Sequence, residues 1–153
     1  MFRRTSVEQA FTPNDGLDRD TLGAESWRRR VVIAPQFHDN HVLMGTLAFN
    51  VLLGRDWPQQ QADIEEAEAI CRALELGPLL ERMPAGLQQV VGETGWQLSH
   101  GEKSRLYIAR ALLQRADVII LDESFAALDP QTLRRTLALV LEKAPTVLVI
   151  AHP

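Results

Sequence analysis

The chain has little of what marks secreted, membrane-spanning or nucleic-acid-binding proteins. It has a single cysteine, Cys71, which excludes an internal disulfide and agrees with a reducing compartment. It has no run of 18 or more apolar residues that could form a transmembrane helix, and no apolar stretch follows the basic residues at its start, as one would in a signal peptide. Its net charge of −4 argues against a nucleic-acid partner. These absences predict a cytosolic protein.

What is present is typical of a globular domain, with 46% hydrophobic and 24% charged residues in a chain of 153. Residues 63–76 have apolar residues at helical spacing, with Cys71 on the apolar face, so we expect this cysteine to be a core residue. Asp63 is the expected N-cap of this helix, and Gly77 with Pro78 is expected to end it.

The order of expected elements predicts an α/β fold. Short apolar strands are expected at residues 30–34, 118–121 and 146–151, and helices at 45–53, 63–76 and 99–115 and after Asp129-Pro130. The strand–helix–strand order of the last third predicts a right-handed parallel crossover. We therefore expect a parallel-sheet core from residues 1–36 and 116–153, with residues 37–115 inserted as a helical subdomain.

Residues 99–102 (SHGE) lie at the start of an expected helix. On its own this pattern indicates a capping box, in which Ser99 and Glu102 each accept a hydrogen bond from the other's backbone N–H. The alternative is an anion site, because Gly101 would let a phosphate approach the backbone at a helix N-terminus.

Polar residues follow the expected strands. Asp122 and Glu123 end one strand, and His152 follows another. An exposed acidic turn is the simple interpretation of the first pair. Ligands of open α/β sheets bind at the carboxyl ends of strands, so Asp122 is also a candidate for Mg²⁺ and Glu123 for a catalytic base. Asp129 is the expected N-cap before Pro130.

Taken in order, these segments resemble the nucleotide-binding domain of ATP-binding cassette (ABC) transporters, a P-loop NTPase-like ATPase. Residues 98–102 (LSHGE) are similar to the family's signature motif, with His100 in place of a glycine and Glu102 in place of a glutamine. Residues 118–123 resemble Walker B, residues 124–129 the D-loop, and Gln36 the Q-loop glutamine. His152 matches the switch histidine.

This resemblance implies the roles of the candidate residues. Glu123 and His152 would be catalytic, and Asp122 and Gln36 would bind Mg²⁺. The residues implied to contact ATP are Gln36, Ser99, His100, Gly101, Glu102 and Asp129.

The resemblance also implies the partners. Residues 42–50 and 91–95 are similar to exporter segments, the first of which meets the membrane domain. A transmembrane permease domain and a second cassette, bound head to tail, are therefore the implied partners. The expected location is the cytoplasmic face of the membrane.

One motif of the family is missing. The phosphate loop, G-x-x-x-x-G-K-[ST], occurs nowhere in the sequence. The expectation is a fragment of an ATP-hydrolysing exporter cassette. The alternative is a catalytically inactive, truncated pseudo-cassette that docks a membrane domain or a partner cassette. DNA-repair ATPases share the signature but carry a long coiled coil between positions equivalent to Gln36 and Ser99, which are too close here to hold one.

Overall fold

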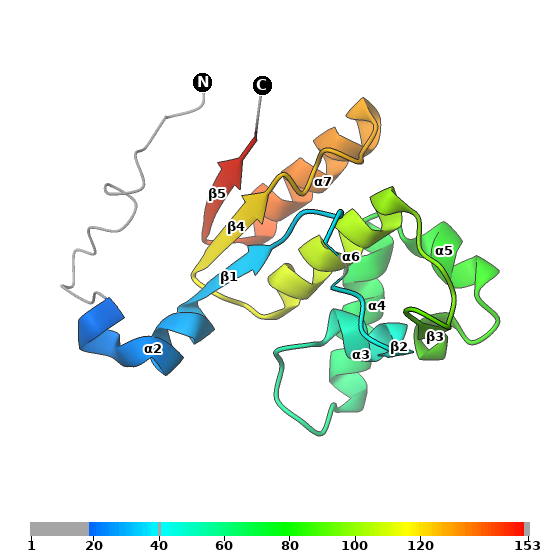
Figure 1. Ribbon diagram of the computed structural model, residues 1–153, viewed down its shortest axis with the longest axis horizontal. Coiled ribbons are helices and arrows are strands. Elements are labelled where there is room, and N and C mark those ends of the chain that lie inside the picture. The colour runs from blue at the N-terminus through cyan, green and yellow to red at the C-terminus, as the bar shows by residue number, and fades with distance from the viewer. Residues whose placement is uncertain (1–18, 40, 152–153) are drawn as a thin grey trace.

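Three parallel strands form the main sheet of the computed structural model, which describes residues 19–39 and 41–151 (Figure 1). Strand β1 (Val31–Ala34) pairs with β4 (Val118–Asp122), and β4 pairs with β5 (Thr146–Ile150), giving the order β1-β4-β5. The parallel pairing confirms the predicted α/β core. Strand β1 ends at Ala34, as Pro35 predicts.

One face of this sheet is covered by two helices, α6 (His100–Leu113) and α7 (Pro130–Lys143). Val32 and Ala34 of β1 share this face with Ile119 and Leu121 of β4, and all four are buried in the main hydrophobic cluster. The alternate residues are less buried, and Ile33 is 54% exposed. The sheet therefore fixes α6 and α7 side by side next to the strand ends.

The residues between β1 and β4 form mainly helices. These are α3 (Leu47–Val51), α4 (Gln61–Ala73), α5 (Gly77–Arg82) and the short 3₁₀ helix η1 (Gly86–Gln88). Two two-residue strands, β2 (Gly45–Thr46) and β3 (Val90–Val91), pair antiparallel. Helix α6 contacts α3 and α4 as well as the sheet, so it joins the two parts of the molecule. No helix in the described part of the chain has both the length and the apolar character that crossing a bilayer requires.

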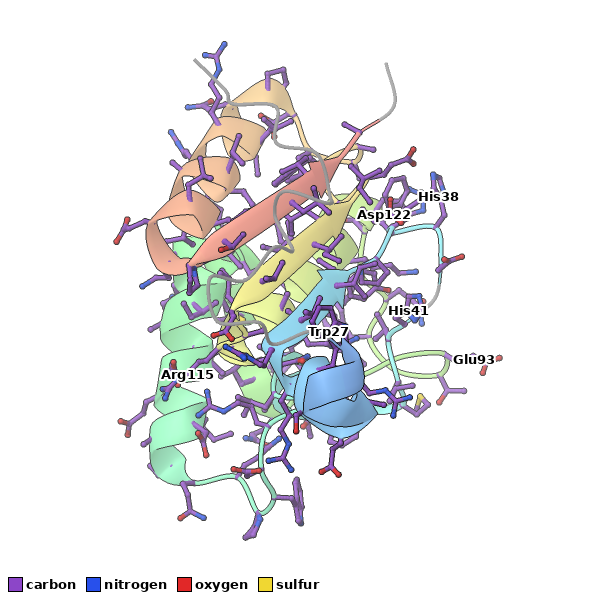
Figure 2. The ribbon with its side chains drawn as sticks, turned by 90° about the vertical axis from the view of Figure 1, so that its left-hand side faces the viewer. Trp27, His38, His41, Glu93, Arg115 and Asp122 are labelled. Atoms are coloured by element: carbon purple, nitrogen blue, oxygen red, sulfur yellow. The ribbon has the colours of Figure 1, made fainter. Side chains whose placement is uncertain are left out.

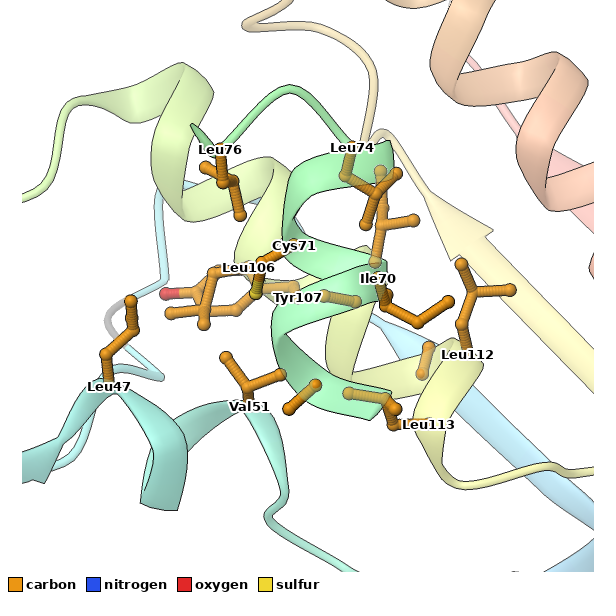
Figure 3. Packing of buried hydrophobic residues seen from close by; sticks show 14 of the residues in the cluster. Leu47, Val51, Ile70, Cys71, Leu74, Leu76, Leu106, Tyr107, Leu112 and Leu113 are labelled. Carbon is orange, nitrogen blue, oxygen red and sulfur yellow. The ribbon is translucent and has the colours of Figure 1, made fainter. Parts of the chain in front are cut away.

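The core confirms the expectation for Cys71. Its side chain is fully buried between α3, α4 and α6, together with Leu47, Val51 and Leu106 (Figure 3). Burying a leucine or valine side chain of this kind contributes about 1.5–3 kcal/mol. Burial also raises the pKa of the Cys71 thiol to about 12, so the thiol is protonated at neutral pH.

The bounds of α4 differ from the prediction at both ends. The helix begins at Gln61, and Asp63 occupies its third position, where its carboxylate accepts a hydrogen bond from the Gln60 N–H at 2.8 Å. The helix ends at Ala73, because Glu75 adopts a left-handed backbone (φ 59°). Gly77 and Pro78 therefore do not end this helix but begin the next one.

A further helix, α2 (Arg19–Arg30), precedes β1 and was not predicted. Gly23 interrupts it with a non-helical backbone (φ 76°, ψ 156°), so the apolar periodicity that would indicate a helix is broken.

Candidate functional site

The carboxyl ends of the parallel strands gather the candidate residues at one edge of the sheet. Gln36 lies two residues beyond β1, Asp122 is the last residue of β4, and Glu123 follows it. The buried Ser124 hydroxyl donates a hydrogen bond to the Ala34 carbonyl oxygen at 2.7 Å. This bond holds the end of β1 beside the segment after β4. Asp122 and Glu123 are both half-buried, and Figure 2 shows Asp122 at the same edge as His38.

The backbone of Glu123, the candidate catalytic residue, has an unusual conformation. Its φ is 46°, in the left-handed region that disfavours any residue with a Cβ. Two hydrogen bonds fix this conformation. Its N–H donates to the Ile150 carbonyl oxygen at 2.9 Å, and its carbonyl oxygen accepts from the Ala126 N–H at 3.0 Å. Held strain of this kind concentrates at functional sites.

A cavity of about 380 Å³ opens beside Glu123. Its other walls come from the D-loop segment (residues 124–129), α7 and the end of β5. The lining residues are Phe125, Ala126, Leu133, Ile150 and Ala151. The carboxyl edge of the sheet is therefore hollowed next to the candidate carboxylate.

The start of α6 confirms the predicted capping box. Ser99 Oγ accepts from the Glu102 N–H at 3.2 Å, and Glu102 Oε2 accepts from the Ser99 N–H at 2.8 Å. The other carboxylate oxygen of Glu102 forms an ion pair with Arg82 of α5. Both oxygens of Glu102 are thus engaged by protein groups, whereas Ser99 and His100 are exposed.

His100 joins the signature segment (residues 98–102) to the segment after β1. Its ring lies 4.8 Å from the Phe37 ring, centroid to centroid, and Phe37 follows Gln36 directly. The His38 ring packs on the same phenylalanine at 3.9 Å. The sequence did not single out Phe37, because an apolar residue in a loop has no pattern that distinguishes it from an ordinary core residue.

The D-loop segment passes close to Gly101 at the start of α6. A Cβ at this position would be 3.3 Å from the Ala127 carbonyl oxygen. The N-terminus of α6, the residues after β1 and the D-loop segment therefore meet in one place. The sequence predicted these motifs separately, and the fold brings them together.

Asp129 is confirmed as the N-cap of α7. One of its carboxylate oxygens accepts from the backbone N–H groups of Gln131 and Thr132, at 3.0 and 3.1 Å. The hydrogen bond from the Thr132 side chain, together with these backbone bonds, holds the pKa of Asp129 below its usual range. Its implied contact with ATP stays a prediction. His152, the other predicted catalytic residue, lies outside the described residues.

A second network braces the segment that the resemblance places against a membrane domain. The Tyr107 hydroxyl of α6 accepts from the His41 N–H at 3.0 Å and donates to the Asp39 carbonyl oxygen at 3.2 Å. Arg110, one turn on, donates to the Asn50 carbonyl oxygen at 2.8 Å. Between these anchors, Leu43 is 46% exposed. The sequence did not reveal Tyr107 and Arg110 as the braces.

The donor set suits Mg²⁺ only in the presence of further ligands. No group of three or more histidine, cysteine or acidic residues within residues 19–39 and 41–151 is arranged to hold a metal ion. Asp122 and Gln36 supply one carboxylate and one amide oxygen at the same sheet edge. Mg²⁺ is commonly held by one or two carboxylates together with waters and substrate phosphates, and this donor set fits that pattern.

This combination of a parallel sheet, an acidic strand end and a capped helix is the framework of an ATPase domain. The sequence model of the ABC transporter family matches residues 8–126, and the chain belongs to that family. Its fold is that of the ATPase domain of ABC exporters.

Two curated relatives and one solved structure illustrate the similarity. The chain is 38% identical to the mitochondrial iron–sulfur clusters transporter ATM1 of Debaryomyces hansenii, over 99% of this chain and 22% of the relative. It is 39% identical to the ATP-dependent lipid A-core flippase of Vibrio cholerae, over 90% of this chain and 23% of that protein. A bacterial Atm1-family ABC exporter, solved with ATP bound, matches with a TM-score of 0.75 and 29% identity, over 90% of this chain and 24% of that one. The chain thus spans about a quarter or less of these proteins.

Proposed function

We propose that this chain supplies the signature helix and the hydrolytic edge of an exporter-type ATPase that couples ATP hydrolysis to transport. The observation that carries the proposal is that Asp122 and Glu123 lie at the carboxyl end of β4, beside the end of β1, while the D-loop segment that follows them passes close to Gly101 at the start of α6. Support also comes from the relatives, which include a transporter and an ATP-dependent flippase.

The roles follow from the chemistry of each group. Asp122, with Gln36, would hold Mg²⁺ through oxygen ligands and water. Glu123 would orient or deprotonate the attacking water, with His152 contacting the γ-phosphate. Bound ATP would supply the phosphoryl group, and Mg²⁺ would offset the negative charge of the phosphates and of Asp122.

The signature segment would serve a different nucleotide. The exposed Ser99 and the backbone at Gly101 lie at a helix N-terminus, where N–H groups and the helix dipole favour a phosphate. In a head-to-tail pair of cassettes this phosphate belongs to ATP held by the partner. Glu102 would act indirectly by fixing Ser99, since both of its oxygens are engaged.

The implied partners are therefore a second ATPase domain and a transmembrane permease domain. The segment with the exposed Leu43 and Met44, braced by Tyr107, would face the permease. The chain would then lie at the cytoplasmic face of the membrane, through the permease.

The lack of a phosphate loop in the sequence sets the first test. A helix N-terminus contributes only about 0.3–1 kcal/mol to binding an exposed anion, and the phosphate loop normally supplies the main contacts. The chain alone should bind Mg-ATP very weakly in calorimetric titration and release no phosphate. Low-micromolar binding would contradict this part of the proposal.

The second test supplies the missing phosphate loop. When the chain is joined to the phosphate-loop strand and helix of an exporter relative, Glu123→Gln should preserve ATP binding and reduce turnover by about 10²–10⁴. Glu142→Gln, the same change at an exposed residue of α7, is the control and should have no effect. Equal turnover in the wild type and Glu123→Gln would reject the assignment of Glu123.

A docking pseudo-cassette is the second candidate function, favoured by the missing phosphate loop and by His100 and Glu102 in the signature segment. A pseudo-cassette would co-purify with a permease partner to the same extent in wild type and in Glu123→Gln. It would show no ATP turnover even when the phosphate loop is supplied.

A further inference from the structure

Glu75 occupies a position where a side chain is normally avoided. It follows α4 with a left-handed backbone, φ 59°. Its N–H donates to the Arg72 carbonyl oxygen at 3.0 Å, and the Leu76 N–H donates to the Cys71 carbonyl oxygen at 2.9 Å. These two bonds form a Schellman motif, whose left-handed residue is usually glycine. A glutamate in this place indicates that its side chain has a use that offsets the strained backbone.

Glu75 contacts two helices, α6 through its backbone and α7 through its side chain. Its backbone carbonyl oxygen accepts from Arg105 Nη1 of α6 at 2.7 Å, and Arg105 also donates through Nε to the Gly101 carbonyl oxygen at 3.0 Å. Its carboxylate forms an ion pair with Arg135 of α7. One residue therefore contacts the signature helix with its backbone and the helix after the D-loop segment with its side chain.

The Glu75 carboxylate is charged in its contact with α7. The hydrogen bond from Arg135, together with the charges of Arg135 and Arg105, lowers the pKa of the Glu75 carboxyl, so the carboxylate is ionised throughout the neutral range. The Glu75 side chain is 29% exposed and that of Arg135 58%, so the carboxylate is the more shielded partner of the ion pair.

We propose that Glu75 is a positioning residue that sets the signature helix α6 relative to α7 and thereby relative to the D-loop segment. The link runs from Gly101 through Arg105 and Glu75 to Arg135. It runs parallel to the close approach of the D-loop segment to Gly101, where an added Cβ would lie 3.3 Å from the Ala127 carbonyl oxygen. Motion at either helix is transmitted to the other because Glu75 is fixed at both of its ends. The consequence for catalysis rests on the proposed function, whereas the link itself does not.

The test is amide hydrogen exchange on the 153-residue chain, which needs no ATPase activity. Glu75→Gln removes the charge that pairs with Arg135. It should accelerate exchange about tenfold both at residues 103–105 of α6 and at residues 133–135 of α7. Glu68→Gln is the matched control, because Glu68 pairs with Arg72 on the same helix, and it should leave both regions unchanged. Acceleration confined to residues 73–78 would overturn the proposal.

Two further variants separate positioning from folding. Glu75→Gly suits the left-handed backbone and should keep thermal stability while accelerating exchange in the same two regions. Arg105→Gln, a change in α6, should accelerate exchange at the start of α7 in the wild type but add nothing in the Glu75→Gln background. Additive effects of the two substitutions would show that α6 and α7 respond independently and would reject the link.

The catalytic consequence is a separate readout. In the completed ATPase described above, Glu75→Gln should lower kcat about tenfold with KM for ATP unchanged, because the proposed role of Glu75 is to position α6 and α7 through Arg105 and Arg135. If Glu123→Gln leaves turnover unaffected while the exchange results hold, the proposed function fails and the Glu75 link stands.

Discussion

The hydroxyl of Ser124 donates a 2.7 Å hydrogen bond to the carbonyl oxygen of Ala34, joining two strands that are 90 residues apart in the sequence. Both residues are fully buried, so neither group has access to water. The bond closes the sheet edge at which Gln36, Asp122 and Glu123 lie. Its removal would take one hydrogen bond from a buried carbonyl beside the candidate site.

Ser124→Ala should therefore reduce the free energy of unfolding by about 1 kcal/mol, the net contribution of one buried hydrogen bond. Urea denaturation followed by circular dichroism measures this change. Ser26→Ala, the same substitution at an exposed residue, should stay within about 0.5 kcal/mol of wild type. Equal effects of the two substitutions would contradict the role of the buried bond.

Glu102 should be more tolerant of glutamine than of alanine. Glu102→Gln keeps an oxygen that accepts the Ser99 N–H and loses only the charge that pairs with Arg82. Glu102→Ala removes both the acceptor of the Ser99 N–H and the ion pair, and it should cost about 1–3 kcal/mol, at least twice the cost of Glu102→Gln. Thermal unfolding of both variants decides this. Similar losses for the two would mean that the ion pair, rather than the cap, dominates.

The Cys71 thiol should be unreactive in the folded chain. Its pKa of about 12 lies above the ordinary value of 9.0, so thiolate is scarce at pH 8, and the side chain is fully buried. Iodoacetamide at pH 8 should modify Cys71 only at the rate of unfolding, and rapidly in denaturing urea. Rapid modification without urea would place the thiol outside the core.

The same pKa shift gives a pH dependence of stability. Folding favours the protonated thiol, so this contribution is fully present below about pH 9 and is lost as the pH rises towards 12. Between pH 9 and 10 the free energy of unfolding should fall by about 1 kcal/mol more in wild type than in Cys71→Ala, which lacks the thiol. Urea midpoints at both pH values measure this difference.

Gly95 should not accept alanine. An added Cβ would lie 2.7 Å from the Val90 carbonyl oxygen, a backbone atom that already accepts the Trp96 N–H. Gly95→Ala should cost about 1–3 kcal/mol and loosen the exporter-like segment 91–95. Gly77→Ala is the control, because its Cβ would meet only the end of the Arg72 side chain, at 3.6 Å. Equal stability of the two variants would contradict this packing.

The elements that sequence reasoning predicted well are those in which local chemistry and packing agree. The Ser99 capping box, the Asp129-Pro130 helix start and the parallel apolar strands each have a signal that does not depend on distant residues. The end of β1 before Pro35 is also predictable from the local sequence, because proline has no backbone N–H to donate to the sheet.

The elements that were missed depend on contacts far away in the sequence. Helix α4 ends early because Glu75 is held left-handed by contacts with α6 and α7, which no local pattern could indicate. The strands β2 and β3 are two residues each, too short for a period of two to show. At the candidate site, the contact of His100 with Phe37 likewise joins segments more than 60 positions apart, and the motifs alone gave no reason to pair them.

At position 123, the residue that best suits the left-handed backbone is not the residue that the proposed hydrolysis needs. A glycine there would relax the backbone and make the chain more stable, and it would also delete the carboxylate. Glutamine keeps the backbone cost and removes only the charge, so Glu123→Gln isolates the chemical role, whereas Glu123→Gly changes two properties at once. A sequence optimised for thermal stability alone would therefore drift away from the residue on which the proposed hydrolysis depends.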